Sequence, residues 1–148
     1  MPGADPHAAP ATPPPARRLT DAELAALRAP YAELIGFVPP RIMARTELGA
    51  RLDPELLRLQ EAARMRAMYP ECFDTKTSQL MLFGILLALM GDAARLHAIA
   101  ARRAGASWAE LHAVVGLAYL FRGMPAANLG AEVLLKLAEA EGAAAPTA

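Results

Sequence analysis

One histidine stands where an acid/base catalyst could work. His97 lies inside a segment that is expected to be helical, and its neighbours one turn away are Ala93, Ala100 and Ala101. Residues one turn apart share a helix face, so small side chains surround the imidazole and leave room for a ligand. A histidine can take up or give away a proton near neutral pH. His97 is therefore the candidate catalytic residue, and a histidine that packs in the core or faces solvent is the alternative.

Arginines beside the apolar segments could bind a carboxylate. Arg95, Arg122 and the pair Arg64 and Arg66 flank apolar stretches. A guanidinium can hold a carboxylate through two hydrogen bonds. A solvated or ion-paired role is the alternative for each of them. Three further arginines are expected on a solvated face: Arg41, Arg45 and Arg51.

Metal and thiol chemistry have little support in the sequence. The histidines His7, His97 and His112 show neither HxxxH nor HExxH spacing, so no metal site is predicted. Cys72 is the one cysteine of the chain, which excludes an internal disulfide and a zinc site built from cysteines. We expect Cys72 to be structural. Four methionines are expected to fill the core rather than to bind metal: Met65, Met68, Met81 and Met90.

The chain that must position these residues has 148 residues and a mass of 15.7 kDa, which is the size of one domain. Hydrophobic residues make up 55% of it, which allows a packed core. Lys+Arg and Asp+Glu each number 15, so the formal net charge is zero. This balance argues against a nucleic-acid partner and against binding to an anionic membrane. It does little to prevent self-association, which leaves an oligomer open.

The two ends of the chain differ from the middle. Residues 1–18 are rich in proline, which disfavours helix and burial, so we expect a disordered arm. This stretch lacks the apolar segment of a secretory signal, and the longest uncharged run, residues 77–91, is too short to span a bilayer. We therefore expect a cytoplasmic protein. It would have a single helical domain over residues 19–142 and a disordered tail over residues 143–148.

The pattern within residues 19–142 predicts helices. The stretch LMLFGILLALM, residues 80–90, is apolar on all sides and predicts a central buried helix. β-Branched residues are sparse and no alternating run is bounded by turns, so no sheet is expected. The fold class is all-α, a bundle of about six to eight helices. Capping boxes, capping aspartates and prolines predict the helix starts, at Thr20 with Glu23, Pro30, Pro40, Asp53, Asp74, Asp92, Ser107 with Glu110, and Pro125.

Four motifs in residues 74–132 resemble the carboxymuconolactone decarboxylase family, which also contains the alkylhydroperoxidase D-like proteins. The motifs are D-x-K-T at residues 74–77, A-R-L-H at 94–97, A-G-A-S-x-x-E-L at 104–111 and G-M-P-A-A-N at 123–128. Their order and spacing agree with the family over this core. The resemblance implies an all-helical, alkylhydroperoxidase D-like fold that assembles as trimers or hexamers, with active sites near subunit contacts.

The resemblance also indicates which branch of the family is closer. The peroxidase branch carries C-x-x-C-x-x-x-H, and its two cysteines correspond here to Met90 and Ala93. Thiol peroxidase chemistry is therefore excluded, because a disulfide cycle needs two thiols. The chain resembles the cysteine-free decarboxylase branch. It departs from that branch in two places: Ser78 and Gln79 stand where a glutamate is common, and Leu129 stands where a histidine is usual.

The resemblance implies a cofactor-free enzyme that decarboxylates a small carboxylated lactone or ring-cleavage acid, an activity of aromatic-compound catabolism. Loss of CO₂ requires a cation to hold the substrate, donors to stabilise the enolate and an acid to return a proton. His97 is predicted to be the proton donor or enolate partner, Arg95 or Arg122 the carboxylate clamp, and Asn128 a polar group that orients the substrate. The alternatives are a non-catalytic oligomeric family member, or an isomerase or hydrolase that uses the same pocket.

Overall fold

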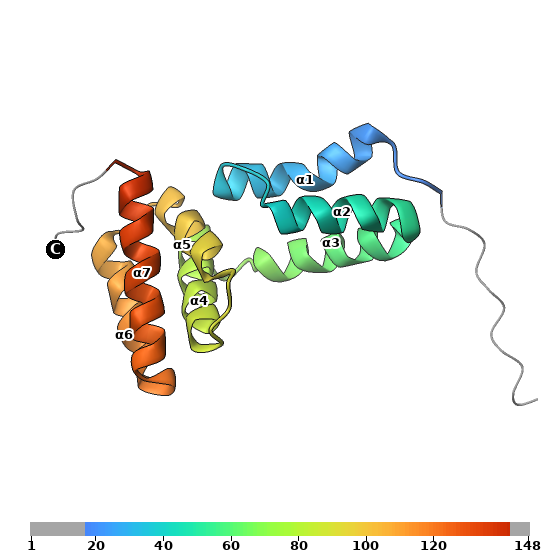
Figure 1. Ribbon diagram of the computed structural model, residues 1–148. Coiled ribbons are helices and arrows are strands. Elements are labelled where there is room, and N and C mark those ends of the chain that lie inside the picture. Colours follow the sequence, from blue (N-terminus) through green and yellow to red (C-terminus); the bar gives the residue numbers. More distant parts are fainter. Residues whose placement is uncertain (1–16, 143–148) are drawn as a thin grey trace, which may run out of the picture.

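The computed structural model describes residues 17–142 and shows seven α-helices there (Figure 1). That part of the chain contains no strand and no helix with the length and hydropathy needed to cross a membrane. The all-α prediction and the expected number of helices are confirmed. Residues 1–16 and 143–148, which include most of the predicted arm and the tail, lie outside the described residues. The helices are α1 (Asp21–Ile35), α2 (Pro40–Leu52), α3 (Pro54–Met68), α4 (Thr75–Ala88), α5 (Ala94–Arg103), α6 (Trp108–Arg122) and α7 (Met124–Ala140).

Most helices begin where the capping residues predict. At the start of α1, the Thr20 hydroxyl accepts a hydrogen bond from the Glu23 amide at 3.2 Å, and the Glu23 carboxylate accepts one from the Thr20 amide at 2.8 Å. The same reciprocal pair opens α6. Asp53 and Asp74 cap α3 and α4 through their side chains. These caps satisfy backbone N–H groups that have no partner inside the helix.

Two predicted helix boundaries are wrong. α1 runs through Pro30 without a break, although proline removes one hydrogen bond from a helix interior. The turn that follows buries Tyr31. α5 begins at Ala94 and has no side-chain cap. The carboxylate of Asp92 instead forms an ion pair with Arg41 of α2, with an N–O distance of 2.9 Å.

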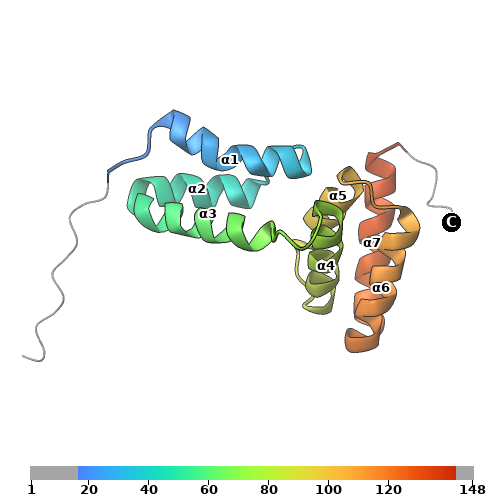
Figure 2. The same ribbon diagram turned by 180° about the vertical axis from the view of Figure 1, so that it is seen from behind.

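The seven helices form two groups (Figures 1 and 2). In the first group, α4 packs against both α5 and α6, and α6 packs against α7. In the second group, α2 packs against α1 and α3. This second group extends away from the first, and the main contact between them joins α1 to α5. The segment that carries His97 therefore lies at the junction of the two groups.

The core of the α4–α7 group is apolar and tightly packed. Phe83 and Leu87 of α4 and Leu111 of α6 are almost completely buried. A Cβ atom placed on Gly130 of α7 would lie 2.6 Å from Val115 of α6, so these two helices leave no room for a larger residue there. α5 lies close to its neighbours because its buried residues are small. These are Ala94, Ala98, Ala100 and Ala101.

The prediction that α4 is buried on all sides is wrong for the single chain. Phe83 and Leu87 are buried, whereas Met81, Ile85 and Leu89 are exposed. Hydropathy indicates that these side chains avoid water but not what covers them. A second chain can bury the exposed face of α4 as the chain's own core buries the other face. Three of the predicted core methionines are also exposed: Met65, Met81 and Met90. Further large apolar side chains are exposed on α6 and at the start of α7: Leu117, Leu120, Phe121 and Met124.

Candidate functional site

A cavity of about 410 Å³ opens where the two groups of helices meet. One wall comes from α1, α2 and α3 and the loop before α2, and the other comes from the start of α5. Its mixed lining, apolar with a few convergent polar groups, is typical of a small-molecule site. The apolar lining residues are Ile35, Pro39, Ile42, Met68, Ala93 and Leu96. The polar ones are Tyr31, Arg45, Gln60, Glu61, Arg64 and His97.

His97 lines the cavity from α5 and is fixed by a residue of α4. Its Nδ1 atom lies 2.8 Å from Oε1 of Gln79, whose side chain is fully buried. Burial lowers the pKa of the His97 imidazole below its ordinary value, because a charged ring is poorly solvated there. The ring is therefore neutral at pH 7 in the unliganded chain.

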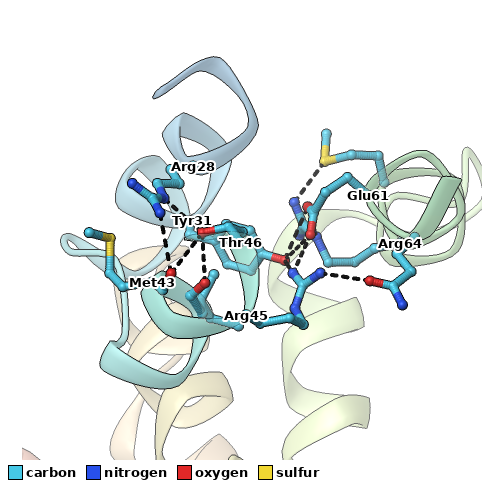
Figure 3. Close-up of polar contacts among 10 residues, drawn as sticks. Arg28, Tyr31, Met43, Arg45, Thr46, Glu61 and Arg64 are labelled. Carbon is cyan, nitrogen blue, oxygen red and sulfur yellow. Dashed lines mark hydrogen bonds and ion pairs between the residues drawn. The ribbon is translucent and has the colours of Figure 1, made fainter. Parts of the chain in front are cut away.

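On the wall formed by α1, α2 and α3, the buried carboxylate of Glu61 accepts hydrogen bonds from three residues (Figure 3). The Tyr31 hydroxyl donates to the two oxygens of Glu61 at 2.9 and 3.1 Å. Arg64 donates to Glu61 through Nε at 2.9 Å, and Arg45 forms an ion pair with the same carboxylate. Arg45 also donates to the Tyr31 oxygen at 3.0 Å and to Gln60 at 3.2 Å. The guanidinium of Arg64 stacks over the Tyr31 ring, 3.9 Å from its centroid.

These contacts shift the pKa values of Glu61 and Tyr31. Burial disfavours the charged form of Glu61, but the hydrogen bonds from Arg45, Arg64 and Tyr31 outweigh it, so the pKa of the carboxyl lies below its ordinary value. Burial and the hydrogen bond to Glu61 raise the pKa of Tyr31 to about 12. Two guanidinium groups thus share one carboxylate, and the cluster carries a net charge of +1. A second, small carboxylate would complement this charge.

A second set of hydrogen bonds fixes α1 against α2 and so positions Tyr31 and Arg45 (Figure 3). Arg28 of α1 donates through Nε to the hydroxyl of Thr46 at 2.7 Å and through Nη2 to the carbonyl of Met43 at 3.2 Å. Thr46 is fully buried, next in sequence to Arg45. The cavity wall therefore rests on polar contacts between helices as well as on apolar packing.

Comparison with known families identifies the chain. A family model described as "Carboxymuconolactone decarboxylase family" matches residues 54–136, more than half of the sequence. The chain belongs to the carboxymuconolactone decarboxylase family. Comparisons with curated proteins and with solved structures gave no match.

The family match divides the cavity between two parts of the chain. Glu61, Arg64 and His97 lie inside residues 54–136, the matched region of the carboxymuconolactone decarboxylase family. Tyr31 and Arg45 lie before it, on α1 and α2. The residues of the cavity that are supplied by α1 and α2 therefore come from outside the matched part of the chain.

The structure brings one of the four sequence-predicted site residues to this cavity. His97 lines it, whereas Arg95, Arg122 and Asn128 are exposed and do not. Arg95 and His97 are two residues apart on α5, which places them about 200° apart around the helix axis. Arg122 ends α6 and Asn128 lies in the first turns of α7. In the single chain these two helices have their main contacts with α4, α5 and each other.

Of the polar wall of the cavity, the sequence pointed to Arg64 as a possible carboxylate-binding residue but not to Tyr31, Arg45 or Glu61. Arg45, expected on a solvated face, lines the cavity and binds Glu61 and Tyr31. A signal for Glu61 and Arg64 was present, because Leu57, Glu61 and Arg64 follow the i, i+4, i+7 spacing of a buried helix face. Charged residues in such a stripe indicate a buried polar cluster. No comparable pattern marks the position of Tyr31.

The remaining candidates for chemistry lie apart from the cavity. Within residues 17–142, no group of three or more His, Cys, Asp or Glu side chains is placed to hold a metal ion. Cys72 is exposed in the connection between α3 and α4. His112 is exposed on α6. The cavity between the two groups of helices is thus the place where this chain gathers an imidazole, two guanidinium groups, a phenol and a carboxylate.

Proposed function

We propose that this chain is a cofactor-free enzyme that uses acid/base chemistry to decarboxylate a small carboxylated lactone or ring-cleavage acid. The observation that carries the proposal is the cavity itself. It holds His97 on one wall and, on the other, a cluster with a net charge of +1. An apolar lining around these groups excludes water and strengthens their electrostatic interactions.

The residues divide the reaction between them. Arg45 holds a substrate carboxylate that does not react, in the role that the sequence assigned to Arg95 or Arg122. When the C–C bond to the reacting carboxyl group breaks, the electron pair moves into a conjugated carbonyl and forms an enolate. His97 carries the proton that then forms the new C–H bond. None of these steps needs a metal or an organic cofactor.

An activity assay with a matched pair of variants tests this role of His97. Wild type, His97→Gln and His112→Gln are compared for CO₂ release from carboxylated γ-lactones. We expect kcat to fall about 100-fold or more in His97→Gln, the usual contribution of an acid/base group. His112→Gln, whose side chain lies on the exposed face of α6, should match wild type. Equal turnover in all three proteins would remove His97 from the mechanism.

Isomerisation or lactone hydrolysis in the same cavity is the second candidate. It is favoured by the lowered pKa of His97, because a neutral imidazole can remove a proton from a carbon acid or from water. The same assay separates the reactions, since decarboxylation releases CO₂ and the others do not. If no lactone is bound or converted, the non-catalytic family member is the correct alternative.

We also propose that the chain works as a homo-oligomer, a trimer or a hexamer. Large apolar side chains are exposed on α4 and α6, which pack against each other, and Phe121 on α6 is 88% exposed. Apolar surface of this kind marks an interface. Light scattering should give a mass of three or six chains for wild type and a smaller mass for Phe121→Ser. His112→Ser, which changes an already polar residue of α6, is the control. A wild-type mass of 15.7 kDa would contradict the proposal.

A further inference from the structure

The contact between Gln79 and His97 ties the catalytic ring to the core. Gln79 is fully buried on α4 and does not line the cavity, whereas His97 does. The distance from Gln79 Oε1 to His97 Nδ1 is 2.8 Å, that of a good hydrogen bond. One edge of the imidazole is therefore held by the α4–α7 core, and the ring reaches the cavity from there.

This geometry decides where the proton of the ring sits. An amide oxygen can only accept a hydrogen bond, so Nδ1 must be the donor. In a neutral imidazole one nitrogen carries the proton and the other carries a lone pair. The lone pair is then on Nε2. Within residues 17–142, Nε2 has no hydrogen-bond partner, and it is not among the buried unpartnered atoms, which are Arg64 Nη1, Ser78 Oγ and Gln79 Nε2.

We propose that Gln79 is a positioning residue that keeps the proton of neutral His97 on Nδ1, so that the lone pair of Nε2 faces the cavity and can accept and return a proton. This inference rests on the proposed function of the cavity. In decarboxylation, Nε2 takes a proton from solvent when the ionised substrate binds. The R–COO⁻ group then loses CO₂, its electron pair passes into the conjugated carbonyl, and Nε2 gives its proton to the carbon. R–COO⁻ and H⁺ become R–H and CO₂, and the imidazole is neutral before and after.

The charged groups near α5 are engaged elsewhere, so the Gln79 amide is the group that positions the His97 ring. Burial lowers the pKa of His97, and within residues 17–142 no ion pair involves its ring. Lys76, which lies beside α5, is paired with Glu110. The ionisable groups that face the ring across the cavity are Tyr31, Arg45, Glu61 and Arg64. They are engaged with one another, as described above.

Nuclear magnetic resonance reads the tautomer without any substrate. Wild type labelled with ¹⁵N in its three histidines is compared with His97→Gln, which identifies the ring signals of His97. At pH 7 we expect a protonated Nδ1 and an unprotonated Nε2. A proton on Nε2, or on both nitrogens, overturns the proposal. The tautomer is read in wild type, and His97→Gln serves only to assign the signals.

Variants at Gln79 then show whether the amide is the cause. Gln79→Leu removes the acceptor, so the Nδ1 tautomer should be lost and kcat should fall at least about tenfold with KM unchanged. Gln79→Glu keeps an acceptor but adds charge, so the acid limb of the pH–kcat profile should move to higher pH. Ser78→Ala changes the neighbouring buried residue, which makes no hydrogen bond to the ring, and should alter neither readout. An unchanged His97 tautomer in Gln79→Leu contradicts the proposal.

The two proposals can fail separately. The expected tautomer in a protein that converts no lactone would support the role of Gln79 in placing the proton and contradict the proposed function alone. Turnover that depends on His97 but not on Gln79 would support the proposed function and contradict the role of Gln79.

Discussion

Helices α1–α3 and helices α4–α7 bury different kinds of side chain. The α4–α7 group encloses Phe83, Leu87 and a series of alanines, with no charged residue among its buried core. The α1–α3 group buries Glu61, whose side chain is 4% exposed, together with Tyr31 and Thr46. Apolar packing therefore stabilises the α4–α7 group. In the α1–α3 group, hydrogen-bonded charged side chains provide much of the stability.

The difference explains why the cavity lies at the junction. A close-packed, mostly apolar group can fix one ring, and it does so through Gln79 and His97. A polar cluster presents donors and charge to a ligand, since Tyr31 and Arg45 already line the cavity. The proton-transfer group thus comes from the rigid side, and the groups that recognise a carboxylate come from the polar side.

The largest effect is expected in the apolar core of the α4–α7 group. Phe83→Ala should lower the free energy of unfolding by about 3–5 kcal/mol, because it leaves a cavity in a fully packed site. Thr75→Ala, at an exposed polar position of the same helix, is the control. Urea denaturation at pH 7 measures both. Equal losses would contradict the assignment of Phe83 to the packed core.

Next in size is the loss of the buried carboxylate. Glu61→Gln should cost about 2–4 kcal/mol at pH 7, because it leaves two guanidinium groups without their anion. The folded-state pKa of Glu61 lies below its ordinary value of 4.5. Its charge therefore stabilises the fold above that ordinary value, and this contribution is lost as the pH falls through the lowered pKa.

The pH dependence sharpens the comparison between the two groups. The difference between wild type and Glu61→Gln should shrink from pH 7 to pH 3, while the difference between wild type and Phe83→Ala should stay nearly constant. Urea denaturation at the two pH values measures both. A Glu61→Gln difference that is the same at pH 3 and pH 7 would contradict the assignment of the charged carboxylate as the stabilising form.

Sequence patterns predicted the α4–α7 group better than the cavity. Capping at Asp74 and Ser107 is local, because each side chain bonds to an amide three residues away. The cavity depends instead on the contact between α1 and α5, and no short-range pattern encodes which helices meet. The choice of Arg95 as a partner of His97 could have been rejected from helix geometry alone, since two residues apart means opposite sides of the helix.

The third effect concerns the recognition of carboxylates by the polar wall. Arg45→Gln should weaken the binding of maleate, a small dicarboxylate, about tenfold or more, because a hydrogen bond between charged groups is lost. Arg122→Gln, at the exposed end of α6, is the matched control and should bind like wild type. Calorimetric titration measures the affinity. Equal affinities in both variants would remove Arg45 from the site.

The smallest effects are expected for the two remaining residues that the sequence predicted. Arg95→Ala and Asn128→Ala remove exposed side chains outside the cavity, so each should change stability by less than about 0.5 kcal/mol and leave maleate affinity unaltered. The same titration checks the affinity, and urea denaturation checks the stability. A weakened affinity in either variant, lost when Phe121→Ser dissociates the oligomer, would mean that a neighbouring copy carries that residue to the cavity. The division between a rigid and a polar wall would then hold for an assembly rather than for one chain.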